Sequence, residues 1–342
     1  MNNALFDDIG SYPLPERVAR GWIKEAFANV ERNRAKLYEL VKEAMWQKIS
    51  AGVEVPNYPQ FQNMITQFIV PITDSGKTEA PLLIKEEEAK LVELDALEEL
   101  AREYREKRGE KLKVRICVTG PIELYYNQFP PPVYIDVLSN IAKSVGRFIT
   151  RAVEDAKAYD VVCASIDEPS MGLDPRIEEE GVITALTLAS EYAHRKNVDT
   201  QIHLHSPIFY ETVCQVDGIT AIGLESAANP SLLALIEKRQ LDTYDKYLRI
   251  GVARTDILSM AAEYDEVHHT NAFRDKGVLK TVVNAYNSPE NVRKRLENAY
   301  TIFGDRIRYV GPDCGLGTFP SQELAYQVLK NTSVGVKEVF VR

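Results

Sequence analysis

The alternation of strand-like and helix-like segments constrains the fold of this chain more than any single motif does. Short runs rich in β-branched residues, of which 114–119 and 160–166 are the clearest, alternate with longer stretches of helical periodicity. This pattern is typical of a parallel sheet whose strands are joined by helices. The eight strands that we predict are 5–10, 52–56, 114–119, 160–166, 200–205, 219–224, 278–284 and 307–311.

Eight strand–helix units predict an α/β protein with a (β/α)8 TIM barrel, and a chain of 342 residues fits one such domain over residues 1–342. A nucleotide-binding sheet is the weaker alternative, because no glycine-rich phosphate-binding fingerprint follows any predicted strand. The predicted helices lie in 16–50, 85–108, 133–157, 179–196, 230–238, 289–303 and 321–333.

Two predicted connections, 57–113 and 239–277, are longer than usual. Long connections after barrel strands lie on the catalytic side of the barrel. We therefore expect these two segments to be lids or docking segments, with surface decoration as the alternative.

Composition and charge narrow the class of protein. The net charge of -9 and the pI near 5.3 argue against a nucleic-acid-binding surface. No apolar stretch approaches the ~18–20 residues of a membrane span, and the first residues lack the pattern of a signal peptide. The four cysteines are scattered without framework spacing, which favours a reducing compartment. We therefore expect a cytoplasmic enzyme that binds neither membrane nor nucleic acid.

Metal-ligating side chains stand where three predicted strands end. The chain has only five histidines and four cysteines, yet His203 and His205 end one strand, Glu225 follows the next, and Cys314 follows the last. Residues i and i+2 of a strand face the same way, and barrel strand ends converge on one mouth. Two nitrogens, one carboxylate and one thiolate suit zinc. The alternative is that Glu225 caps a helix and that Cys314 is a small buried apolar residue.

Two further strand ends carry candidate substrate-binding residues. After the first predicted strand, Gly10 permits a close backbone approach, and the amide and hydroxyl of Ser11 can bind a carboxylate. Asp167 and Glu168 close the fourth predicted strand, where a carboxylate could hold a substrate ammonium group. An ordinary turn and an ordinary strand terminus are the structural alternatives.

Six separated motifs, in order along nearly the whole chain, resemble the catalytic C-terminal barrel of cobalamin-independent methionine synthase in its short single-barrel form. The resemblance implies zinc-dependent methyl transfer to the thiol of homocysteine. It also implies that His203, Glu225 and Cys314 are zinc ligands, that Ile9, Gly10 and Ser11 hold the amino acid carboxylate, and that Asp167 binds its ammonium group. The motifs are IGSYP (9–13), VTGPIE (118–123), SIDEP (165–169), HLH (203–205), GLES (223–226) and GPDCGLGTFP (311–320).

The chain departs from the family pattern at three positions. His205 stands where the family has a thiolate ligand, so it is either a fourth ligand or a non-ligand, and with Asp167 it is also a catalytic candidate. Gln60 replaces a carboxylate that helps to hold the amino group. Asn287, in Asn-Ser-Pro, replaces a histidine associated with proton delivery, and Asn cannot shuttle a proton.

These departures favour one methyl donor over another. A folate donor has a poor leaving group that needs protonation, whereas a Co(I) leaving group departs unprotonated. We therefore predict a zinc-dependent methyltransferase that forms methionine from homocysteine and takes the methyl group from methylcobalamin or a corrinoid protein, with a folate donor as the alternative. The sequence also leaves open a coenzyme M-like thiol acceptor, a uroporphyrinogen decarboxylase-like enzyme, and a non-catalytic paralogue that binds a corrinoid or a thiol.

Overall fold

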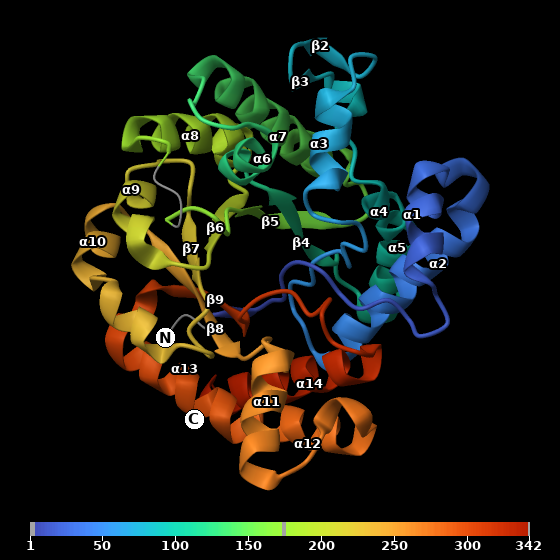
Figure 1. Cartoon of the computed structure of the whole chain (residues 1–342), viewed down its shortest axis with the longest axis vertical. Coiled ribbons are helices and arrows are strands. Elements are labelled where there is room, and N and C mark those ends of the chain that lie inside the picture. The colour runs from blue at the N-terminus through green and yellow to red at the C-terminus, as the bar shows by residue number, and fades with distance from the viewer. Residues whose placement is uncertain (1–3, 173–175, 341–342) are drawn as a thin grey trace.

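Seven parallel strands form a curled sheet at the centre of the molecule (Figure 1). The computed structural model describes residues 4–172 and 176–340. Neighbouring strands are hydrogen bonded in the order β1-β9-β8-β7-β6-β5-β4. Their bounds are β1 Leu5–Phe6, β4 Lys113–Thr119, β5 Asp160–Asp167, β6 Asp199–Leu204, β7 Ala221–Leu224, β8 Tyr247–Ala253 and β9 Ile307–Pro312.

The gap between the two edge strands β1 and β4 is spanned by the predicted strand segment 52–56 and the residue that follows it. Val55 pairs with Asp7, and Asn57 pairs with Arg115, each through an isolated parallel bridge. Within the described residues this segment forms no longer ladder. The structure therefore confirms an α/β fold with a curled parallel sheet, and the complete eight-stranded barrel stays a prediction.

Helices lie around the outside of the curled sheet (Figure 1). The α-helices are α1 Arg20–Ala28, α2 Val30–Ala51, α3 Thr66–Thr73, α4 Val92–Asp95, α5 Leu97–Arg108, α6 Pro121–Gln128, α7 Ile135–Asp155, α8 Glu179–Arg195, α9 Tyr210–Cys214, α10 Lys238–Thr243, α11 Ile257–His268, α12 Lys276–Tyr286, α13 Pro289–Phe303 and α14 Gln322–Phe340. The 3-10 turns are Glu86–Glu88, Pro207–Phe209, Pro230–Leu235, Ala272–Arg274 and Gly304–Arg306. The predicted connection 57–113 contains α3, α4, α5 and a hairpin of β2 Thr78–Ala80 and β3 Leu83–Ile84.

The strand predicted over 278–284 is wrong, because this segment lies in helix α12. Leu279, Val282 and Val283 are buried there at helical spacing, and the side chain of Asp275 caps the helix by accepting from two backbone N–H groups. The strand at this place in the sheet is β8, which lies inside the predicted connection 239–277. The segment that joins β7 to β8 is therefore shorter than the predicted connection 239–277.

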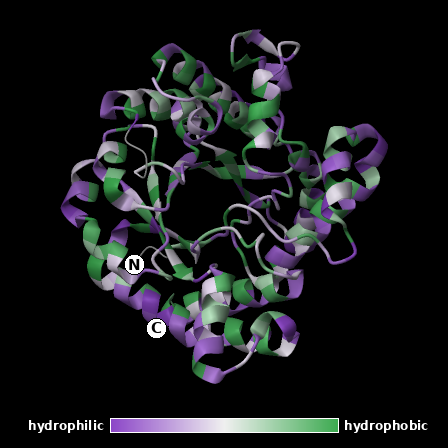
Figure 2. Cartoon of the chain, in the orientation of Figure 1, coloured by the Kyte–Doolittle hydropathy of each residue, from purple (hydrophilic) through white to green (hydrophobic). Residues whose placement is uncertain are grey.

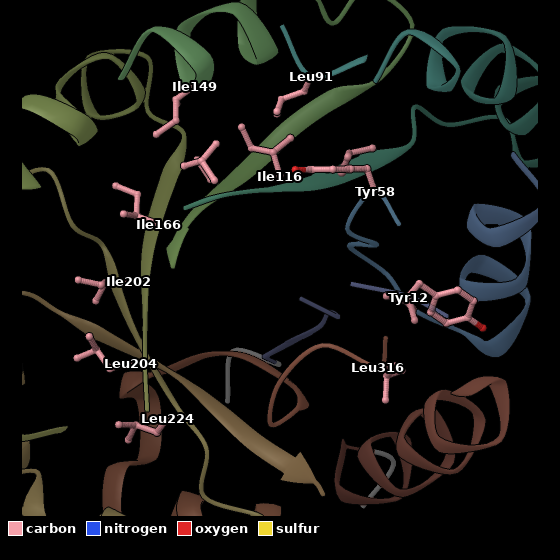
Figure 3. Close-up of a cluster of buried hydrophobic side chains, with 14 of the residues drawn as sticks. Tyr12, Tyr58, Leu91, Ile116, Ile149, Ile166, Ile202, Leu204, Leu224 and Leu316 are labelled. Atoms are coloured by element: carbon pink, nitrogen blue, oxygen red, sulfur yellow. The ribbon is translucent and has the colours of Figure 1, made fainter. Parts of the chain in front are cut away.

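The main apolar core lies between the sheet and its helices. Ile166, Ile202 and Leu204 point outward from neighbouring strands, away from the centre of the ring (Figure 3). Hydrophobic and hydrophilic residues alternate along the peripheral helices (Figure 2), as expected for helices that pack one face on a sheet. Burial of the outward strand face thus fixes which side chains turn toward the inside of the ring.

The inside of the ring contains a buried ion network. Asp7, just after β1, pairs with Arg115 of β4, and its Oδ1 lies 2.9 Å from Nε of Arg249 in β8. All three side chains are fully buried. Because a buried charge without a partner is strongly destabilising, the shared carboxylate ties the end of β1 to β4 and β8.

Glu93 of α4 is a fully buried carboxyl group outside the sheet. Both of its oxygens lie 3.3 Å from Nε2 of Gln62. Burial, which disfavours the charged form, raises the pKa of Glu93 to about 7.

We expect the Glu93→Gln variant to gain stability relative to the wild type as the pH rises. The folded-state pKa of Glu93 lies above the ordinary value of 4.5, so its stabilising contribution is present below about pH 4.5 and is lost as the pH rises through about 7. The difference in free energy of unfolding should change by about 3 kcal/mol across this window. Urea denaturation from pH 4.5 to pH 8 measures it. For exposed Glu106→Gln the difference should stay within about 0.5 kcal/mol, and parallel curves for Glu93→Gln would contradict the prediction.

Candidate metal centre

Four predicted metal ligands come from three strand ends at one edge of the sheet. His203 lies in β6 and His205 just beyond it, Glu225 directly follows β7, and Cys314 follows β9 by two residues. One ligand atom from each residue can be chosen so that all four lie within 4.8 Å of one another. The structure thus brings together the four side chains for which the sequence predicted a common site.

The distances within the cluster match a metal coordination shell. Oε1 of Glu225 lies 3.3 Å from Nε2 of His203 and 3.4 Å from Nε2 of His205. In a tetrahedral zinc site with bonds of about 2.1 Å, neighbouring ligand atoms are about 3.4 Å apart. The two imidazole rings meet nearly edge to face, at an interplanar angle of 80°.

Unsatisfied buried atoms support the same conclusion. Both ring nitrogens of His203 and Oε1 of Glu225 are buried and have no hydrogen-bond partner among the described residues. Buried polar atoms are otherwise nearly always paired, so a metal ion that accepts these lone pairs would satisfy them. The residues present thus fit zinc.

The charges of the four side chains influence one another. Burial by itself would raise the pKa of Cys314, but His203 and His205 outweigh it and lower that pKa below the ordinary value of a thiol. Burial would lower the pKa of His203, yet Cys314 and Glu225 raise it to about 10. The cluster therefore favours a thiolate, which is the form of cysteine that binds metals.

The segment Ile9–Ser11 lies against the loop that follows Cys314. The backbone N–H of Leu316 donates to the carbonyl of Ser11 over 2.7 Å. A Cβ atom on Gly317 would lie 2.3 Å from Oγ of Ser11, so a side chain at that position would displace the Ser11 hydroxyl. Gly10 adopts a φ of +63°, and its N–H donates to Sγ of Cys117 over 3.3 Å. The predicted carboxylate-binding segment therefore adjoins the metal cluster.

Asp167 lies beside His203, because β5 and β6 pair these two residues in register. Its side chain is buried, and Oγ of Ser165 donates to its Oδ1 over 2.8 Å. Glu168 is placed differently. Its two oxygens accept from the backbone N–H groups of Ile122 and Glu123, at 2.9 and 2.7 Å. The Glu168 carboxylate therefore caps helix α6, whereas Asp167 lies next to the cluster.

Gln60 lies in the segment beside Ile9–Ser11. The preceding residue, Pro59, accepts a backbone hydrogen bond from Tyr12 over 2.9 Å, and the side chain of Asn57 donates to the carbonyl of Gly10 over 2.9 Å. Nε2 of Gln60 is buried without a hydrogen-bond partner among the described residues, and its backbone φ is +38°. Gln60 thus presents an unsatisfied amide on a strained segment, and its role as a substrate-binding residue stays a prediction.

Asn287 does not lie at a strand end, contrary to its predicted place, because it follows helix α12. It is fully buried, and its side chain exchanges two hydrogen bonds with the backbone of Arg254, at 2.8 and 2.9 Å. The strand end at this point is that of β8, and the residues that follow it are Arg254, Thr255 and Asp256. Asn287 was placed at a strand end because the strand itself was misplaced. The loop that does follow β8 also begins without a histidine.

Asp313 contributes to the site in a way that the sequence did not predict. It directly precedes Cys314, is buried, and binds the turn after Glu225. Its partners lie 86 and 85 residues away along the chain, so the only signal in the sequence was its place next to a predicted ligand.

Solved structures of two methyl-transfer enzymes share this fold. A B12-independent methionine synthase from Shewanella sp. W3-18-1, in complex with selenomethionine, superposes with a TM-score of 0.62 at 15% identity, over 98% of this chain and 97% of that chain. A methyltransferase from Methanosarcina mazei superposes with a TM-score of 0.58 at 11% identity, over 99% of this chain and 95% of that chain. The sequence matches no protein-family model and no curated protein.

These likenesses show that the chain shares the overall fold of these two proteins over almost its whole length. Within the described residues, none of the helices combines the length and the apolar character that a bilayer crossing requires.

Proposed function

We propose that this chain is a zinc-dependent methyltransferase that transfers a methyl group to the thiol of homocysteine and so forms methionine. The convergence of His203, His205, Glu225 and Cys314 carries the proposal, because a mixed N, O and S ligand set at the carboxyl ends of parallel strands has no structural task of its own. Two structural neighbours, a methionine synthase and a methyltransferase, perform this class of reaction and support the proposal.

The chain's residues would act on the substrate in three ways. Asp167 binds the ammonium group, and the segment Ile9–Ser11 binds the carboxylate, so that the side chain of homocysteine reaches toward the cluster. The four ligands would hold zinc, which when bound lowers the pKa of a substrate thiol and keeps its sulfur in place. His205, whose side chain is 44% exposed, lies at the solvent edge of the cluster, where the thiol proton leaves.

The proposed donor is a methyl-corrinoid. In this transfer a sulfur–carbon bond forms while the cobalt–carbon bond breaks, and the electron pair of the broken bond stays on cobalt. The leaving group therefore needs no acid. The first residues after β8, Arg254 to Asp256, provide no histidine for protonating a folate leaving group, which supports this choice.

The test is methionine formation by the zinc-loaded chain from homocysteine and methylcobalamin, with methyltetrahydrofolate in a parallel reaction. We expect turnover with methylcobalamin that stops when zinc is chelated and returns when zinc is added. Turnover with the folate alone would contradict the proposed corrinoid donor but would leave the proposed enzyme class standing. A zinc-loaded chain that forms methionine from neither donor would overturn the proposed function.

His205→Cys, which restores the ligand type of the family, is expected to retain zinc and to change the rate of methyl transfer without abolishing it. Two neutral imidazoles, one carboxylate and one thiolate leave the zinc site formally neutral, and a second thiolate makes it one unit more negative. A more electron-rich site leaves the substrate sulfur more nucleophilic but less acidic. Zinc content and the pH dependence of turnover measure both effects. A variant with wild-type zinc affinity and an unchanged pH dependence of turnover would mean that this position is not a ligand.

A further inference from the structure

The turn that carries Glu225 is held from the opposite side of strand β8. Asp313, at the end of β9, extends its carboxylate across β8 to the turn after β7. Its Oδ1 accepts from the backbone N–H of Ala227 over 2.9 Å, and its Oδ2 accepts from that of Ala228 over 2.8 Å. Ala227 is two residues beyond Glu225, so both oxygens of one carboxylate fix the turn that presents this ligand.

Strand β8 has the shape that this crossing requires. A Cβ atom on Gly251 would lie 1.9 Å from Oδ1 of Asp313 and 2.8 Å from the carbonyl oxygen of Leu224, so a side chain at that position would displace both the carboxylate and the neighbouring strand. The backbone N–H of Asp313 also donates to the carbonyl of Ala253 over 2.8 Å, which anchors its own main chain to β8. Asp313, which is 2% exposed, is therefore held by β8 through its backbone and by the turn after β7 through its carboxylate.

The position of Asp313 links two ligands that lie on different strands. It is the residue before Cys314, and its carboxylate is hydrogen bonded to the turn after Glu225. We propose that Asp313 is a positioning residue that sets the orientation of the Glu225 carboxylate relative to Cys314. This inference rests on the proposed zinc centre and adds to it a residue that does not itself touch the metal.

The test compares zinc affinity in the wild type and in Asp313→Asn, by competition with a chromophoric chelator. An asparagine side chain keeps the size of the carboxylate but has one acceptor for two N–H groups. We expect the variant to bind zinc about 10–100-fold more weakly, the usual loss when a supporting residue behind a metal ligand is removed. Ser226→Ala is the matched control. It removes only the hydrogen bond from Oγ of Ser226 to the carbonyl of Gly251, 2.9 Å long, in the same turn.

A second readout separates positioning from the simple loss of a charge. In the Co²⁺-loaded protein, a displaced Glu225 changes the visible absorption bands of the metal, whereas a charge effect lowers affinity with unchanged bands. Asp313→Asn with wild-type affinity and an unchanged Co²⁺ spectrum would overturn the inference while leaving the zinc centre standing. Failure of Asp313→Asn to fold would also overturn it, by assigning Asp313 to the fold as a whole. A wild type that binds no zinc would overturn the proposed function and the inference together.

Discussion

Cys314→Ser is expected to remove most of the zinc that the purified chain holds at about one ion per molecule. Zinc binding to structural sites contributes about 10–16 kcal/mol, so one of four ligands accounts for about 2.5–4 kcal/mol. Since every 1.4 kcal/mol is about tenfold, affinity should fall by two to three orders of magnitude. A serine hydroxyl keeps the size of the thiol and is a far weaker ligand. Elemental analysis after dialysis, together with chelator competition, gives both the content and the affinity.

The same substitution at Cys214 controls for the loss of any thiol. Cys214 is buried at the end of α9 and lies outside the metal cluster. Cys214→Ser should therefore keep its zinc. A Cys314→Ser chain that retains stoichiometric zinc at wild-type affinity would remove this thiolate from the ligand set.

Asp167→Asn is expected to raise the apparent KM for homocysteine by two to four orders of magnitude. Breaking a buried carboxylate–ammonium pair on one side costs roughly 3–5 kcal/mol, and asparagine provides no charge. The same thiol without its amino group should lose almost nothing, since it has no ammonium group for Asp167 to bind. The measurement is the KM of each thiol in the wild type and the variant, at saturating methylcobalamin.

Asp160→Asn is a matched control on the same strand, because Asp160 is exposed at the opposite end of β5 and pairs with Lys111. It should leave both KM values unchanged. Equal losses for both thiols in Asp167→Asn would show that Asp167 does not recognise the ammonium group. The assignment of the acceptor as an amino acid would then lose its main residue-level support.

Much of the sheet could be predicted from local sequence. Strands β4 and β5 are runs of β-branched and apolar residues, and nearly every residue in them is buried, as expected for parallel strands with both faces covered. The segment 278–284 shares that composition, but its buried residues Leu279, Val282 and Val283 follow a helical period. Composition predicted a strand there, whereas periodicity and the cap at Asp275 favour the helix.

Strand β8 was missed because the segment 278–284 took its place in the predicted order of eight strands. Its residues, Tyr247–Ala253, are mostly apolar, and six of the seven are buried. Arg249 interrupts this run as Arg115 interrupts β4, and both guanidinium groups are buried against Asp7. Since β4 was predicted despite its arginine, a buried charge does not by itself hide a strand.

The candidate site was easier to predict than the fold around it. His203, Glu225 and Cys314 could be grouped because strand ends converge, which needs only the approximate places of the strands. The role of Asp313 depends on a side chain that crosses β8, the strand that local sequence did not reveal. Glu168 shows the converse case, since its place at a strand end suggested a substrate contact while its partners are the first amides of a helix.

The pairing of the first strand with the last has a consequence for synthesis of the chain on the ribosome. Strand β1 forms its ladder with β9, and Ser11 meets Leu316, so this side of the ring can close only when almost all of the chain has been made. Contacts this distant in sequence form late and slowly. The segment Ile9–Ser11 and Cys314 are therefore brought together in the same closing event. A nascent chain that stops before residue 307 would hold His203 and Glu225 but could complete neither the ring nor the site.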